Sequence, residues 1–222
     1  LPGFGAKNEG ALNFGSFIHK IFEVGFKEKS MKTLLKIAEA ERTTYKVPFR
    51  ENNRMKACLE NFILWNQKLG ETVSTEQLFT IPLDADKDIN FVGIVDRVVK
   101  GTEGGYLVID YKTSKREKKK NTLLDDNQLK GYAYAVHKTY DVPYEKIYCS
   151  HYYPVTGNFV TVKFSRFQID QWKKKQIEKV WRIRKKKTDE FWASKNIFCD
   201  WCEYKEACPA YQSESTVCKR ID

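Results

Sequence analysis

Long apolar runs and export signals are missing from this chain of 222 residues. No stretch approaches the roughly 20 apolar residues that a membrane-spanning helix needs, and no segment has the pattern of a signal peptide. We therefore expect no membrane association and a cytoplasmic location. Without export, the six cysteines belong in a reducing compartment, where clustered cysteines bind metal more often than they pair.

Acidic residues are also in short supply. The sequence has 29 Asp and Glu against 39 Lys and Arg, which gives a formal net charge of +10. This excess favours a polyanionic partner, with nucleic acid first and an acidic membrane surface second. Internal repeats and low-complexity linkers are absent, and 14 Phe, 12 Tyr and 5 Trp can supply a sizeable core. We expect a globular chain of one large domain or two small ones.

Apolar residues at helical spacing predict helices in the first third of the chain, after a Gly-rich loop over residues 1–11. The predicted helices cover residues 12–22, 29–43 and 55–69. Segments rich in β-branched and aromatic residues then predict three strands, over residues 73–83, 90–100 and 105–114. Because short turns join these strands, we expect an antiparallel meander.

The second half of the chain alternates again between helix and strand. A charged loop over residues 115–124 comes first. A helix to about residue 139, strands over 146–153 and 158–164 and a long basic helix over 168–193 follow it. This order predicts a mixed α/β fold whose partly antiparallel sheet is flanked by helices.

The stretch GYLVIDYKTS predicts a buried strand that ends in two charges. Asp110 and Lys112 are two positions apart and share one face, whereas Tyr111 between them points to the other. Burying an acid and a base at a strand end is costly unless each has a partner. A functional site is one interpretation of this pair, and a surface ion pair is the other.

Asp96 is a second acid in an apolar setting, because it shares a strand face with Val92, Ile94 and Val98. It can be a frayed strand end or part of a site. If its strand neighbours that of Asp110, the two carboxylates come within a few ångströms and repel unless a cation lies between them. Oxygen ligands suit Mg²⁺ or Mn²⁺, and an imidazole such as that of His19 favours Mn²⁺. With Lys112 to orient or deprotonate a water, this set supports metal-assisted phosphodiester hydrolysis.

Four short motifs occur in order along the chain: Gly15-x3-His19, Gly93-x2-Asp96, Asp110-x-Lys112 and Gln128-x3-Tyr132. Over residues 12–212 this series resembles the PD-(D/E)XK nucleases of the RecB exonuclease type. The proline of the family's name is absent, since Val95 precedes Asp96, and RecB-type members commonly lack it. The resemblance implies an α/β, restriction-endonuclease-like core, a central mixed sheet flanked by helices with a Cys-rich C-terminal tail.

The resemblance also implies roles for individual residues. It makes Asp96, Asp110 and His19 side-chain ligands of Mg²⁺ or Mn²⁺, with the backbone carbonyl of Tyr111 completing the set. Lys112 becomes the catalytic lysine. In the same way, Gln128 and Tyr132 would line the site and hold the nucleic-acid strand.

Cysteines near the C-terminus form a second motif. Cys199-x2-Cys202-x5-Cys208 has metal-ligand spacing that fits zinc or an iron–sulfur cluster. The resemblance to AddB-like and CRISPR-associated relatives implies a 4Fe–4S cluster whose fourth cysteine precedes the Gly-x3-His segment. No cysteine precedes Cys58 here and the chain starts at Leu1, so we expect the fourth ligand upstream of residue 1, with a substitute ligand as the alternative. Cys58 and Cys149 fit core positions, and Cys218 lies off the family pattern.

We therefore expect a nuclease core over residues 1–195, with residues 196–222 packed on it as a cysteine-cluster segment of the same domain. The expected activity is that of a metal-dependent DNA exonuclease acting on single strands or duplex ends in repair or recombination. A helicase or recombination protein is the expected partner, in a bacterial or phage-infected cell.

Two basic runs can contact phosphates or can be solvated faces: Lys115, Arg116 and Lys118–Lys120, and Arg182 with Arg184–Lys187. The alternative function is a non-catalytic nucleic-acid-binding module with a structural metal site. A third is a zinc-only structural protein.

Overall fold

The computed structural model describes residues 9–101, 103–187 and 193–212. The chain divides into two compact units, one of Asn13–Ile177 and one of Leu1–Leu12 with Glu178–Asp222. Within the described residues, no helix is both long and apolar enough to cross a membrane.

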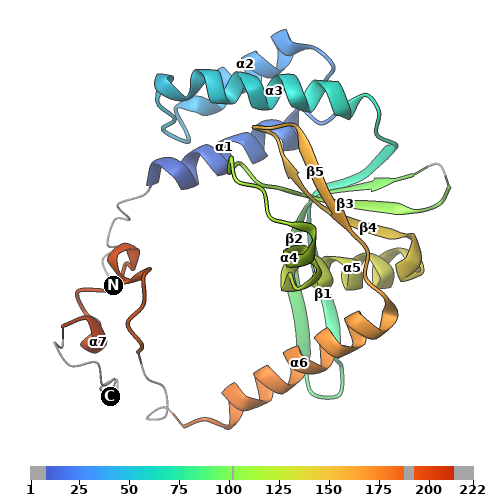
Figure 1. Cartoon of the computed structure of the whole chain (residues 1–222), viewed down its shortest axis with the longest axis vertical. Coiled ribbons are helices and arrows are strands. Elements are labelled where there is room, and N and C mark those ends of the chain that lie inside the picture. The colour runs from blue at the N-terminus through green and yellow to red at the C-terminus, as the bar shows by residue number, and fades with distance from the viewer. Residues whose placement is uncertain (1–8, 102, 188–192, 213–222) are drawn as a thin grey trace. The chain divides into compact units, whose positions relative to one another are not determined.

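A five-stranded mixed sheet forms the centre of the larger unit, in the order β1-β2-β3-β4-β5 (Figure 1). The strands are β1 (Glu71–Asp84), β2 (Ile89–Lys100), β3 (Tyr106–Tyr111), β4 (Ile147–Tyr153) and β5 (Asn158–Val162). The first three form the predicted antiparallel meander, and β5 is antiparallel to β4. Only β3 and β4 pair in parallel. That pairing requires a crossover, which the helices between them supply.

Helices cover both faces of this sheet, as predicted. One side carries α1 (Glu9–Val24), α2 (Met31–Arg42) and α3 (Asn52–Asn66), and α5 (Asn127–Tyr140) packs on the other. The remaining helices are α4 (Lys120–Leu124), α6 (Arg166–Lys185) and α7 (Pro209–Gln212). Single 3-10 turns form η1 (Phe49–Glu51), η2 (Tyr144–Lys146) and η4 (Cys199–Trp201). The fold is thus an α/β, restriction-endonuclease-like core.

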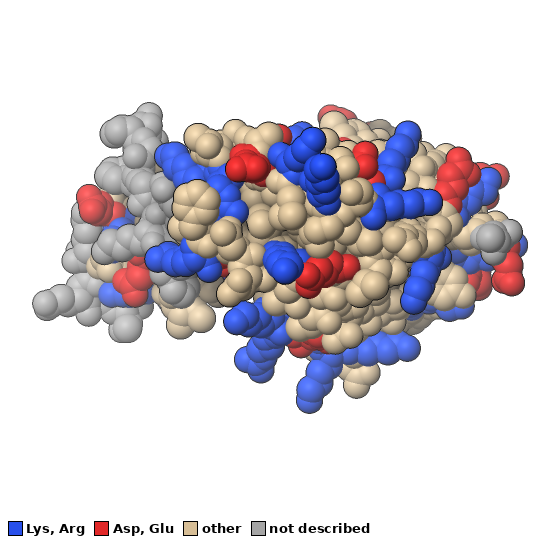
Figure 2. Space-filling model, turned by 90° about the horizontal axis from the view of Figure 1, so that it is seen from above, with Lys and Arg blue, Asp and Glu red and all other residues tan. Residues whose placement is uncertain are grey.

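Basic side chains are spread widely over the surface. Figure 2 shows Lys and Arg scattered across the viewed face, with Asp and Glu side chains between them. The net charge therefore does not gather in one block on this face. On this face, contacts with a polyanion would come from particular basic segments and not from one large basic surface.

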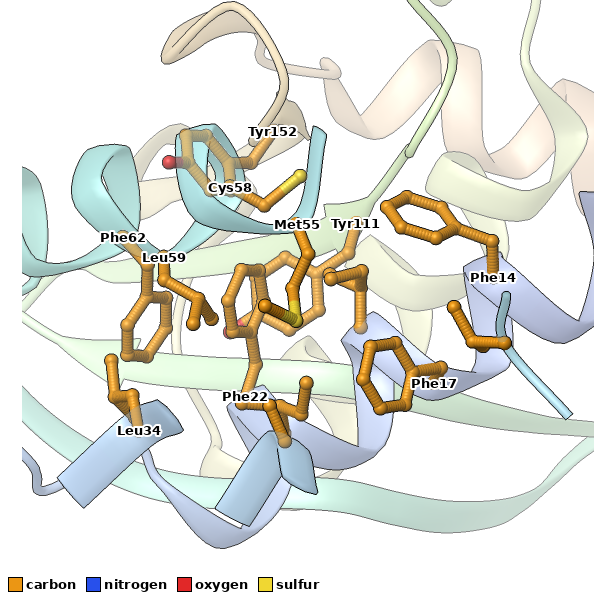
Figure 3. Packing of buried hydrophobic residues seen from close by; sticks show 14 of the residues in the cluster. Phe14, Phe17, Phe22, Leu34, Met55, Cys58, Leu59, Phe62, Tyr111 and Tyr152 are labelled. Carbon is orange, nitrogen blue, oxygen red and sulfur yellow. The ribbon is translucent and has the colours of Figure 1, made fainter. Parts of the chain in front are cut away.

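The core beside α1 combines aromatic and aliphatic side chains (Figure 3). The rings of Phe22 and Phe62 stack with centroids 4.1 Å apart, and Phe22 meets the edge of Tyr111 at 5.0 Å. Burying one such side chain contributes roughly 1.5–3 kcal/mol. Because Tyr111 is the last residue of β3, these contacts hold α1 against the end of that strand. Cys58 is fully buried in this cluster, and Cys149 is fully buried on β4, as the sequence predicted.

Several predicted boundaries differ from those of the structure. Residues 9–11 belong to α1 rather than to the preceding loop, whose residues 1–8 lie outside the described part. The predicted loop over 115–124 contains α4, because the fully buried Leu123 gives this short helix an anchor. α6 ends at Lys185 instead of residue 193; continuing it would place the like charges of Arg182 and Lys186 one turn apart, which disfavours a helix. Residues 188–192 lie outside the described part.

Candidate active site

Asp110 and Lys112 form an ion pair at the boundary between core and solvent. Lys112 Nζ lies 2.6 Å from Asp110 Oδ2, and the two side chains are 34% and 3% exposed. The Lys112 N–H donates to the Tyr152 carbonyl at 2.8 Å, which keeps Lys112 aligned with β4. Burial raises the pKa of Asp110, the charge of Asp96 adds to this, and Lys112 opposes it. The pair is therefore an oriented acid and base rather than a loose surface bridge.

Asp96 occupies a position where the ladder between β2 and β3 runs out. The last backbone pair on this side joins Arg97 to Ile109. The N–H of Tyr111 donates instead to Asp96 Oδ2 at 2.6 Å. This charge-assisted bond fixes the Asp96 carboxylate at the end of β3. The two strands that carry Asp96 and Asp110 are neighbours, as the sequence argument required.

His19 reaches the same point from α1. Its Nε2 lies 3.0 Å from the Tyr111 carbonyl oxygen, and its Nδ1 lies 3.6 Å from Asp96 Oδ2. Burial lowers the pKa of His19, but the bond to Asp96, the negative charges and the Tyr111 carbonyl outweigh it and hold the pKa above its usual value. Three of the groups predicted as metal ligands therefore meet at the end of β3.

Glu76 joins this group, although nothing in the sequence analysis pointed to it. It lies opposite Asp96 in the register that its neighbours on β1 set, and its φ of 46° is in the left-handed region. A non-glycine residue pays roughly 1–3 kcal/mol for such a backbone, and sites are where such strain collects. Burial, followed by the charge of Asp96, raises the pKa of Glu76 to about 7.

The ligand atoms of His19, Glu76 and Asp96 all lie within 4.8 Å of one another. Among the described residues this is the only group of three His, Cys, Asp or Glu side chains so arranged. Two carboxylates and an imidazole beside a backbone carbonyl are donors that suit a divalent cation. The residues present therefore fit a metal site at the end of β3.

His151 is a further residue that the sequence analysis missed. It lies on β4, beside Asp110 in the parallel register, and is fully buried. Its Nε2 has no hydrogen-bond partner and lies 3.5 Å from Asp110 Oδ2 and 3.8 Å from Asp126 Oδ2. Burial, with the charge of Lys112, lowers the pKa of His151 to about 4. A neutral imidazole therefore separates two carboxylates near the site.

Gln128 and Tyr132 lie one turn apart on α5, as predicted. Gln128 Nε2 donates to the Tyr132 hydroxyl at 2.6 Å, and that hydroxyl donates to the Ile94 carbonyl at 2.5 Å. Tyr132 is 3% exposed, whereas Gln128 is exposed. The helix begins where Asp126 acts as the N-cap and accepts the N–H groups of Gln128 and Leu129. Tyr132 thus ties α5 to β2, and Gln128 is the residue that faces solvent.

The cysteine segment belongs to the other unit. Its backbone makes successive tight turns, with Cys202 N–H donating to the Cys199 carbonyl at 3.2 Å and Cys208 N–H donating to the Lys205 carbonyl at 3.3 Å. The N–H of Asn196 donates to Cys199 Sγ at 3.2 Å. Cys202 is exposed, and Cys199 and Cys208 are half-buried. Cys218 lies outside the described residues.

Comparisons with known proteins give one matching family model and matching solved structures. A family model of the PD-(D/E)XK nuclease superfamily matches residues 4–209. The matching solved structures include one described as the crystal structure of SSO0001, which is 17% identical. That match covers 89% of this chain and 85% of the other, with a TM-score of 0.38. No match was found among the curated proteins. Because the family model spans nearly the whole sequence, the chain belongs to the PD-(D/E)XK nuclease superfamily, and with it to the metal-dependent nucleases.

Proposed function

We propose that this chain is a Mg²⁺- or Mn²⁺-dependent DNA exonuclease. The observation that carries the proposal is the meeting of His19, Glu76 and Asp96 beside the ion pair of Asp110 and Lys112. A cation group next to a lysine at a solvent boundary is an arrangement that supports phosphodiester hydrolysis. Membership of the nuclease superfamily supports the same reaction.

In this proposal His19, Asp96, Asp110 and the Tyr111 carbonyl hold the divalent cation, with Glu76 as an added carboxylate. When bound, such a cation offsets the negative charge that builds on a phosphate under attack. Lys112 projects from the same strand end with a 34% exposed side chain. We assign it to orienting the attacking water and contacting the phosphate oxygen that gains charge, while Asp110 fixes the position of its ammonium group.

The nucleic-acid strand needs contacts beyond the metal group. We assign the exposed Gln128 to the strand, with Tyr132 holding it in place through their 2.6 Å bond. Lys115 and Arg116 are exposed on the loop after β3, whereas Lys118 is engaged with Asp126 at 3.0 Å. The first two are therefore the better phosphate contacts. The second basic run, Arg182 with Arg184–Lys187, is a further candidate for phosphates.

For the cysteine segment we propose a 4Fe–4S cluster held by Cys199, Cys202 and Cys208 with one further ligand. The hydrogen bond from Asn196 N–H to Cys199 Sγ supports this, because N–H bonds to sulfur stabilise the thiolates that such clusters need. A visible absorption spectrum distinguishes the cluster from zinc, whose thiolates are colourless. We further propose that this segment packs on the nuclease core as part of one domain. A role in repair or recombination beside a helicase, in the cytoplasm, completes the proposal.

The test is cleavage of end-labelled single- and double-stranded DNA with Mg²⁺ or Mn²⁺, beside Lys112→Ala and Asp110→Asn. We expect the wild type to shorten the strands from an end and both variants to lose about 10²- to 10⁴-fold in rate while still binding DNA. Lys36→Ala, at an exposed lysine of α2, is the matched control. Equal inertness of wild type and variants, with DNA binding retained, would instead identify a non-catalytic nucleic-acid-binding module. Cleavage of closed circular DNA, which has no ends, would show that the protein is an endonuclease rather than an exonuclease.

A further inference from the structure

Three aliphatic side chains of the hairpin formed by β1 and β2 face solvent together. Leu78 is 62% exposed, Val92 60% and Ile94 50%. Leu78 lies directly opposite Ile94 in the ladder, and Thr80 lies opposite Val92. We call Leu78, Val92 and Ile94 the hairpin patch. The apolar residues of β2 have the pattern of a core strand, but in the structure they form part of a contiguous exposed apolar surface. Such surfaces mark interaction sites.

The hairpin patch begins beside the candidate metal group. Ile94 is two residues from Asp96 on β2, about 7 Å along the strand. Leu78 lies on the same side of the hairpin as Ile94, because directly opposed residues of an antiparallel pair do. The patch therefore extends along the hairpin from a point two residues from Asp96, a member of the cation group.

The opposite side of the hairpin is covered and anchored. Phe79 is 2% exposed, and the Phe91 ring meets the edge of Trp172 with centroids 5.6 Å apart. A Cβ on Gly131 of α5 would come within 2.4 Å of Phe91, so helix and strand are in close contact. The Tyr132 hydroxyl holds the Ile94 carbonyl from α5 as well. The patch is thus a firmly held surface rather than a loose hairpin.

We propose that the hairpin patch receives unpaired bases of the nucleic acid next to the phosphate that is cut. This inference rests on the proposed nuclease function and adds that the enzyme takes a single-stranded end without reading its sequence. Unpaired bases present flat apolar faces, and aliphatic side chains such as Leu and Ile pack against or between bases in other nucleic-acid complexes. Phosphates gain nothing from an uncharged surface, so bases rather than backbone are the fitting occupant.

A second protein is a poorer occupant for this surface. Stable protein interfaces bury about 800 Å² on each partner, well beyond what three partly exposed aliphatic side chains offer. A base or two next to the cut phosphate is an occupant of matching size. Continuity with the cation group favours the same conclusion.

The experiment measures binding of a fluorescent single-stranded oligonucleotide in EDTA, where metal-dependent cleavage is blocked. A second oligonucleotide carries abasic sites at its terminal three positions. We expect wild-type protein to bind the abasic strand about tenfold more weakly, since each base contact has a substantial effect on affinity. The variant Leu78→Thr/Val92→Thr/Ile94→Thr keeps strand-forming residues and removes the apolar surface. It should bind the intact strand about as weakly as wild type binds the abasic one.

The variant's discrimination between the two strands decides the matter. If it still prefers the intact strand as strongly as wild type, the inference is overturned. Leu64→Gln, at a 65% exposed aliphatic on α3, is the matched control and should behave as wild type. If the triple variant does not fold, the single variant Ile94→Thr is used in its place, and its preference for the intact strand over the abasic strand is compared with that of wild type.

The proposed function fails separately from this inference. A wild type that neither cuts nor binds any DNA overturns both proposals. A wild type that cuts DNA but binds intact and abasic strands equally overturns this inference alone. A change in oligomeric state on size-exclusion chromatography, with base discrimination unchanged, would reassign the patch to a protein interface.

Discussion

Two sets of candidate metal ligands lie in this chain, and different things hold them in place. The ligands near β3 come from separate elements that a buried aromatic core fixes, as the contact between Phe22 and Tyr111 illustrates. The cysteines lie within ten residues of one another, in a segment of tight turns with exposed or half-buried thiols. The first set is positioned by packing before any cation binds. For the second set, in the part that the structure describes, local turns do most of the positioning.

The comparison predicts that the two sites fail in different ways. A ligand substitution in the packed site should remove chemistry and leave the fold intact. A ligand substitution in the cysteine segment should remove the cluster and the order that the cluster supports. Four experiments test this contrast.

The largest effect is expected for Asp96→Asn. This change keeps an oxygen that can accept the Tyr111 N–H but removes the charge that a cation requires. We expect cleavage to fall by more than about 100-fold, since even residues that only support a ligand contribute 10- to 100-fold. Gel assays give the rate, and circular dichroism should show an unchanged fold. Asp170→Asn, at an exposed carboxylate of α6, is the control. If Asp96→Asn also lost the iron–sulfur cluster of the cysteine segment, the packed site and that segment would be one cooperative unit.

Cysteine replacement tests the other half of the contrast. We expect Cys202→Ser to remove the broad visible absorbance of protein purified without oxygen, because a hydroxyl does not replace a thiolate ligand. Mn²⁺ binding at the packed site should be unchanged, as titration calorimetry can measure. Cys149→Ser is the control, because that thiol is buried on β4, and its absorbance should match wild type. Loss of Mn²⁺ binding in Cys202→Ser would contradict the separation of the two sites.

Glu76→Gln has a more moderate expected effect. The amide keeps the size of the side chain while removing one of the two carboxylates that approach His19 within 4.8 Å. We expect the Mn²⁺ concentration for half-maximal activity to rise about tenfold, with a smaller change in maximal rate. Glu60→Gln, at an exposed residue of α3, should leave both values alone. An unaltered Mn²⁺ dependence in Glu76→Gln would remove this residue from the ligand set.

The smallest effect concerns the pH dependence of stability in metal-free protein. The pKa of Glu76 is about 7 in the folded chain, above the roughly 4.3 of an unfolded chain. The fold therefore binds this proton more tightly, and that stabilisation is present at low pH and lost as the pH rises through about 7. With solvent screening, we expect metal-free protein to lose on the order of 1 kcal/mol between pH 5 and 8. Urea denaturation in EDTA measures it, and Glu76→Gln should flatten the profile. Stability that rises over this range in wild type alone would contradict the argument.

Much of the fold could be predicted because its signals are local. Apolar spacing marked α1 to α3, and β-branched segments marked the meander. The exposure of Val92 and Ile94 could not be predicted, because alternation indicates that residues share a face but not what covers that face.

The site divides in the same way. The spacing of Asp110 and Lys112 predicted a shared face, and the ordered motifs added His19, Asp96, Gln128 and Tyr132. Glu76 and His151 carry no motif, and each gains its position only from strand pairing, opposite Asp96 and beside Asp110. For these two residues, nothing short of that pairing indicates that they lie near the site.

The sequence by itself therefore determined the elements, the order of the motifs and the strand end at which an acid and a base emerge. Periodicity and spacing act over a few residues, so these features needed no knowledge of the packing. Only the tertiary structure decided which carboxylates and imidazoles meet at that strand end and which apolar face stays open beside them. Those outcomes depend on pairing between distant segments and on which helix covers which face, and no local pattern encodes either.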